Sequence, residues 1–170
     1  HDGTLLACAE MLRGGITCFN DMYFFPEAAA RAALRAGMRA ALGIITIEFR
    51  SAYASDAQDY LAKGMALRDT LRDEPLLSFC LAPHAPFTVS DATFAQIATY
   101  AGELDIPVHI HLHETAQEIS DSLAQHGVRP LARLEKAGLL GPGLIAVHSV
   151  NLDDHEIALL ARHGCSVAHC

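Results

Sequence analysis

Residues 107–118 hold the densest group of side chains in this chain that could carry out chemistry. Apolar residues and histidines alternate there, so His109, His111 and His113 fall on one parity and Glu114 follows directly. A period of two is typical of a β-strand, and we expect the three imidazoles on one strand face. Imidazole is the commonest metal ligand, and buried imidazoles need partners. The pattern favours a metal or proton-transfer site over histidines that merely bond a neighbour or face solvent.

Other histidines recur at strand ends further along the sequence. Six of the ten lie in or at the ends of predicted strands, namely His84, His109, His111, His113, His148 and His169. The carboxyl ends of the strands in a closed α/β barrel converge on one mouth, where active sites are built. In an open sheet the same residues would spread along an edge. The distribution therefore favours a barrel with a site at its mouth.

Histidines on separate strand ends are typical of a catalytic metal site, which keeps a position open for water and lowers the pKa of that water to about 7. Glu114 could carry a proton to a leaving group, or it could complement the positive end of the next helix. His84 is flanked by two prolines, which restrict the backbone. It either binds a ligand or belongs to a structural turn.

Strand and helix patterns alternate along the whole chain at intervals of about thirty residues, which predicts an α/β fold with a parallel sheet. We predict a helix over 2–13, helices beginning at Pro26 and Pro130, and a helical piece after Glu114. Three further helices have predicted caps, at Ser55 and Asp56, at Ser90 and at Asn151. The predicted strands are 16–22, 39–47, 76–82, the histidine strand, 144–149 and a last one from 165.

Two architectures fit this alternation. An open doubly wound sheet is complete at 170 residues, whereas a (β/α)8 TIM barrel needs about 250. The chain lacks an initiating Met, begins inside a predicted helix and stops on a predicted strand. These ragged ends and the placement of the histidines favour a barrel fragment.

Composition narrows the classes of partner. The formal charge is −8 without any lysine- or arginine-rich cluster, which argues against nucleic acid and against an anionic membrane surface. No apolar run approaches the roughly 18 residues of a membrane span. Five cysteines without a C-x-x-C pair suit a reducing cytoplasm. We expect a cytoplasmic protein with a small-molecule partner, and a homo-oligomer is left open.

Four motifs together resemble the amidohydrolase superfamily. They are Ala-Pro-His-Ala-Pro at 82–86, His-Leu-His-Glu-Thr-Ala-Gln-Glu at 111–118, Val-His-Ser-Val at 147–150 and Val-Ala-His-Cys at 167–170. The nearest resemblance is to the 5-methylthioadenosine/S-adenosylhomocysteine deaminase group and its triazine-hydrolase and chlorohydrolase relatives. It covers essentially the whole chain, with the motifs in order.

This resemblance implies a (β/α)8 barrel of the metal-dependent hydrolase type, of which residues 1–170 are about strands 2–7. It implies His111 as a ligand of one divalent ion, zinc or otherwise iron or manganese. Glu114 is implied as the proton shuttle to the purine ring nitrogen and His148 as the residue that orients the attacking water. His84 is implied as a ribose contact, while His109 and His113 are implied as supporting residues.

The implied activity is hydrolytic deamination of an adenine-type nucleoside, with another aminated heterocycle such as a triazine or guanine as the nearer alternative. A metal-free α/β binding domain is the alternative from another class. The family's His-x-His on strand 1, its Asp on strand 8 and its β-sandwich domain are missing from this sequence. We therefore expect weak metal binding and no activity from these 170 residues alone. Arg50 is a candidate for one of the family's substrate-contacting arginines.

Overall fold

The computed structural model describes all residues 1–170, as six strands that alternate with seven helices. The strands are β1 (Cys18–Asp21), β2 (Arg39–Thr46), β3 (Leu77–Pro83), β4 (Val108–Leu112), β5 (Leu144–His148) and β6 (Ser166–Ala168). The helices are α1 (Asp2–Arg13), α2 (Pro26–Ala36), α3 (Ala57–Leu71), α4 (Asp91–Leu104), α5 (Ala116–His126), α6 (Pro130–Lys136) and α7 (Asp154–His163). None of these helices combines the length and apolarity needed to cross a membrane.

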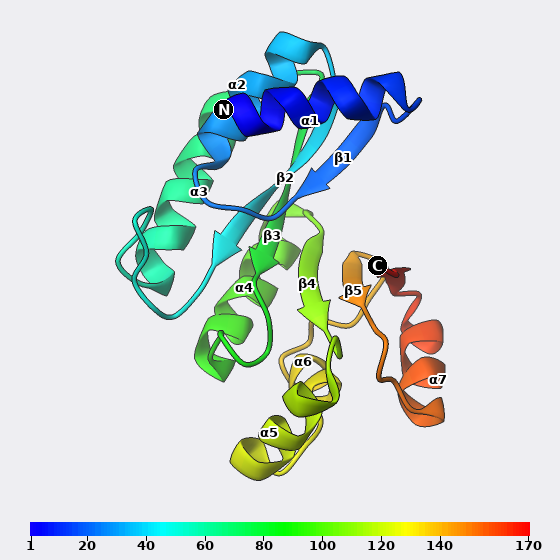
Figure 1. Cartoon of the computed structure of the whole chain (residues 1–170). Coiled ribbons are helices and arrows are strands. Elements are labelled where there is room, and N and C mark those ends of the chain that lie inside the picture. Colours follow the sequence, from blue (N-terminus) through cyan, green and yellow to red (C-terminus); the bar gives the residue numbers. More distant parts are fainter.

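The strands form one parallel sheet in the order of the sequence, β1-β2-β3-β4-β5-β6. Figure 1 shows β1 to β4 descending side by side, with the two chain ends at opposite sides of the molecule. In a doubly wound sheet the order of the strands reverses after the first strands, and the helices then cover both faces. A sheet whose order never reverses is the wall of a barrel, so the predicted fold class is confirmed and the doubly wound alternative is wrong.

The two faces of the sheet differ in composition. Alternate residues of the strands pack against the helices in a continuous apolar core, which includes Leu42, Leu81, Ile110 and Leu144. The opposite parity carries small or polar side chains on the inner face, among them Cys80, whose thiol donates to Asn20 Oδ1 at 3.7 Å, and also His109 and His111. The helices therefore cover the outer face of the barrel wall, and His109 and His111 lie on its inner face.

Local sequence signals fix most helix starts. Asp56 and Ser90 accept from the backbone N–H three residues on, as predicted caps should. The predicted cap at Asn151 is wrong, because the N-cap of α7 is Asp153, two residues later, which forms a capping box with Glu156. Asn151 is thereby free to bond elsewhere.

Candidate active site at the strand ends

Four residues singled out from the sequence lie together at the carboxyl ends of β3, β4 and β5. His84 follows β3, His111 lies in β4, Glu114 comes two residues after β4, and His148 ends β5. The ring centroid of His111 is 5.0 Å from that of His84 and 5.5 Å from that of His148. Residues up to 64 positions apart (His84 to His148) therefore share one edge of the sheet.

His111 is held by one nitrogen and presents the other. Its Nδ1 lies 2.7 Å from the carbonyl oxygen of His84, which can only accept, so Nδ1 carries the proton. In the neutral tautomer with this proton position, the Nε2 atom keeps its lone pair. A neutral imidazole whose second nitrogen is bonded to a carbonyl is the usual form of a histidine that ligates a metal.

His84 has its own fixed orientation. Its Nδ1 lies 3.0 Å from the hydroxyl of Thr88, and that hydroxyl donates to the carbonyl of Ala85 at 3.1 Å. Since the hydroxyl proton is used, His84 donates through Nδ1 and its Nε2 is left to accept. Burial, together with nearby His111, lowers the pKa of His84, so the ring is neutral at pH 7.

His148 reaches the site because of an unusual backbone conformation. Its register partner is Leu112, whose side chain is buried in the apolar core, so an extended His148 would point away from the inner face. His148 instead has a φ of 72°, in the left-handed region, and its ring stacks on His111. Its Nε2 lies 3.6 Å from Glu114 Oε2. The pairing of imidazole and carboxylate suits proton transfer or the positioning of a water.

His113 departs from the predicted common face. At a φ of 53° its ring is fully buried on the helix side, where Nε2 accepts from the N–H of Leu131 at 3.2 Å. Its Nδ1 lies 3.3 Å from the carbonyl of Asn151 and 3.4 Å from Glu156 Oε2. Burial lowers the pKa of His113. Both nitrogens have partners within the fold, so the expectation of three imidazoles on one face is wrong for this residue.

His109 shares the inner face with His111, at a centroid distance of 6.1 Å. Only 7% of His109 is exposed and its Nδ1 has no hydrogen-bond partner. Burial, and secondly nearby His111, lowers the pKa of His109 to about 4, so the ring is neutral. His169 lies next along the edge, with Nδ1 3.2 Å from the carbonyl of His148. Arg50 is exposed in the loop that follows β2.

A buried polar network beside the site was missed by sequence reasoning. Arg129 donates to both carboxylate oxygens of Glu156, at 2.8 and 2.7 Å, and to the carbonyl of Asn151 at 2.7 Å. Glu118 accepts from the backbone N–H of Glu114 at 3.0 Å. The Thr-x-x-Glu pattern at 115–118 is a capping-box signature that could have found Glu118. No local pattern indicates the pairing of Arg129 with Glu156, which are 27 residues apart.

The imidazole nitrogens at these strand ends are atoms of a type that can ligate a divalent ion. Neutral imidazole nitrogen is a normal zinc ligand, and the Nε2 atom of His111 is available. No group of three His, Cys, Asp or Glu side chains is arranged to hold an ion within these 170 residues. The chain therefore offers a suitable ligand in His111 but not a complete shell.

Comparison with known proteins agrees with this architecture. The profile of the amidohydrolase family matches residues 1–170. The chain is 51% identical over 169 residues to a 5-methylthioadenosine/S-adenosylhomocysteine deaminase of Saccharophagus degradans, with 99% of this chain and 38% of that protein covered. It is 43% identical over 167 residues to a 5'-deoxyadenosine deaminase of Methanoregula boonei, with 98% of this chain and 38% of that protein covered.

Solved structures give the same result for the fold. A zinc-bound adenosine deaminase from Xanthomonas campestris superposes with a TM-score of 0.96 at 52% identity, over 99% of this chain and 38% of that one. An atrazine chlorohydrolase from Arthrobacter aurescens, at 21% identity, has a TM-score of 0.89 and is similar in fold. The chain thus spans about two fifths of the length of its relatives. The resemblance drawn from the four motifs is confirmed, and the chain belongs to the amidohydrolase family.

Proposed function

We propose that this chain is the central part of a metal-dependent hydrolytic deaminase. The full-length enzyme, with barrel strands 1 and 8 and a β-sandwich domain outside residues 1–170, would convert 5'-methylthioadenosine or S-adenosylhomocysteine to the inosine analogue. Water adds to the amino-bearing carbon of the adenine ring and ammonia leaves. The names of relatives at 51% and 43% identity support this substrate class.

One observation carries the proposal. The His148 imidazole lies 3.6 Å from the Glu114 carboxylate, directly against the His111 ring, at the mouth of the barrel wall. A general acid or base must lie within hydrogen-bond reach of the proton that it moves, directly or through one water. Glu114, with 51% of its side chain exposed, can take a proton from the attacking water and deliver it to the ring nitrogen. His148 holds that water and stabilises charge on the developing oxyanion.

His84 and His111 have the remaining roles. The free Nε2 of neutral His84 can accept a hydrogen bond from a ribose hydroxyl. His111 would be one ligand of a zinc, iron or manganese ion, with the other ligands outside this chain. When bound, the ion supplies Lewis acidity toward water. The five cysteines are unpaired, which supports a reducing compartment such as the cytoplasm.

The test is an assay of the full-length enzyme. Purified protein with a measured zinc, iron and manganese content is given 5'-methylthioadenosine, S-adenosylhomocysteine, 5'-deoxyadenosine, adenosine, an aminated triazine and guanine. Ammonia release is followed together with the change in ultraviolet absorbance. We expect about one metal ion per chain and turnover of the 5'-substituted nucleosides. Turnover of only a triazine or of guanine would move the assignment to that substrate. Protein that purifies without stoichiometric metal and without turnover would contradict the proposal and favour a binding domain.

A further inference from the structure

Asn151 connects the two loops that carry the proton-transfer residues. It lies three residues after His148, and its Nδ2 donates to the carbonyl of His113 at 3.3 Å and to that of Glu114 at 3.1 Å. Its backbone N–H also donates to the carbonyl of His113, at 3.0 Å. This residue therefore fastens the loop after β5 to the loop after β4.

Glu114 is held from both sides as a result. Its N–H donates to the carboxylate of Glu118, which is buried in the first turn of α5, and its carbonyl accepts from Asn151. The Glu114 side chain itself has no bonded partner apart from its contact with His148. Because no packing fixes this carboxylate, the position of its backbone decides where it lies.

The same bonds surround the strained part of the backbone. His113, His148 and Ser149 all have positive φ values, of 53°, 72° and 53°. Non-glycine residues keep such conformations only where their surroundings over-determine them. The carbonyl of His113 accepts three N–H groups, two of which belong to Asn151. Asn151 thus contributes to the geometry that turns His148 toward Glu114.

We propose that Asn151 is a positioning residue that sets the separation of Glu114 and His148. The inference rests on the proposed function, because it assigns a purpose to that separation. Asn151 does not touch the reacting atoms in this role. It acts through the backbone carbonyls of two neighbouring residues.

The first test is the kinetics of Asn151→Ala in the full-length enzyme, with 5'-methylthioadenosine. A displacement of about 1 Å in a catalytic group can cost roughly 100-fold, so we expect kcat to fall about 30-fold, with KM changed less than about twofold. Asn151→Asp keeps the shape but turns an acceptor toward the two carbonyls, and it should lose at least as much. Gln117→Ala removes a nearby exposed amide that bonds only Asp121, and it should leave both constants unchanged. An unchanged kcat in Asn151→Ala would overturn the inference.

A double-mutant cycle separates positioning from general destabilisation. If Asn151 acts by placing Glu114, adding Asn151→Ala to Glu114→Gln should cost little further activity. If it only stabilises the fold, the same factor should be lost in both backgrounds, and the inference would be wrong.

A structural measurement keeps the inference testable even if the enzyme deaminates none of these nucleosides. In a crystal structure of the full-length Asn151→Ala variant, the separation of Glu114 Oε2 and His148 Nε2 should lengthen from 3.6 Å. An unchanged separation would overturn the role of Asn151, whereas inactivity of the parent enzyme alone would overturn only the proposed function.

Discussion

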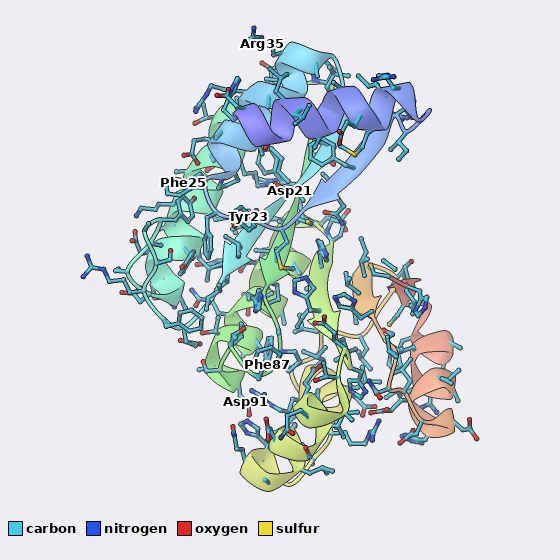
Figure 2. All side chains as sticks on the ribbon, viewed as in Figure 1. Asp21, Tyr23, Phe25, Arg35, Phe87 and Asp91 are labelled. Atoms are coloured by element: carbon cyan, nitrogen blue, oxygen red, sulfur yellow. The ribbon has the colours of Figure 1, made fainter.

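The end of β3 and the ends of β4 and β5 hold their histidines by different means. The loop after β3, which carries His84, is fastened by a few side chains from other elements. His111 bonds the carbonyl of His84, Glu48 accepts from the N–H of Ser90 at 2.9 Å, and Arg133 spans the loop. Arg133 of α6 donates to the carbonyls of Pro86 and Val89 and pairs with Asp91. Figure 2 shows Phe87, on this loop, close to Asp91, the first residue of α4. Only 5% of Arg133 is exposed, so its bonds replace water that the loop carbonyls would otherwise need.

The ends of β4 and β5 are fastened by a network with several members. Arg129 and Glu156 form a two-point ion pair, fully buried His113 contacts Glu156, and Asn151 bonds both loops. Three residues there, His113, His148 and Ser149, have left-handed backbones, whereas the loop after β3, which carries the proposed substrate contact His84, has no such residue. The comparison teaches that the proposed proton-transfer pair, Glu114 and His148, whose role depends on a short distance, is positioned by a network of bonds.

Glu114→Gln should have the largest effect, because it removes the proposed proton carrier itself. General acid–base catalysis contributes about 10²–10⁴-fold, so we expect kcat of the full-length enzyme to fall about 10³-fold. The metal content and the thermal unfolding temperature should not change, since the side chain is half exposed and bonds no other group closely. Steady-state kinetics together with metal analysis would check this. Activity within a few-fold of the parent would remove Glu114 from the mechanism.

Arg129→Met should come next, through stability. Without the guanidinium, the Glu156 carboxylate, with 5% of its side chain exposed, loses its two closest charged contacts. Breaking a buried ion pair from one side costs about 3–5 kcal/mol, and because Arg129 is partly exposed we expect about 3 kcal/mol. Urea unfolding followed by circular dichroism would measure it. Adding Glu156→Leu should recover part of the loss, and no loss in the single variant would show that the network is not important for stability.

Arg133→Lys should act on substrate binding. Lysine keeps the charge but lacks the planar fork that reaches two carbonyls and a carboxylate, so the loop that carries His84 should loosen. We expect KM for the nucleoside to rise about tenfold, equivalent to about 1.4 kcal/mol, with kcat almost unchanged. Arg162→Lys, an exposed substitution on α7, is the matched control. A fall in kcat without a change in KM would show that the two strand ends are not separate in function.

Asp153→Asn should have the smallest effect, and one that depends on pH. The backbone hydrogen bond from Glu156 holds the pKa of Asp153 below its ordinary value of 3.8. A depressed folded pKa stabilises the protein above the unfolded pKa, and this contribution is lost as the pH falls through the folded pKa. The unfolding temperature of the variant should therefore be lower than that of the parent at pH 7, and the difference should shrink below pH 4. A difference that does not vary with pH would contradict the assignment.

Local patterns in the sequence determined the elements of this protein. Alternation of apolar residues located the strands, and Asp56 and Ser90 were recognisable as caps, because strand parity and cap bonds involve residues within four positions. The motif at 111–118, together with the motifs at 82–86, 147–150 and 167–170, indicated the family from the sequence alone. His84, His111, Glu114 and His148 were all selected from the sequence, since strand ends in a barrel must converge.

Only the tertiary structure decided the surroundings and hydrogen-bond partners of each histidine. His109, His111 and His113 have the same spacing, but one lacks a partner at Nδ1, one bonds the carbonyl of His84 and one is buried against α6. The left-handed turns at His113 and His148, and the bonds from Asn151, depend on residues about 38 positions away. Backbone conformations of this kind are stabilised by long-range bonds, and no pattern within a few residues can specify them.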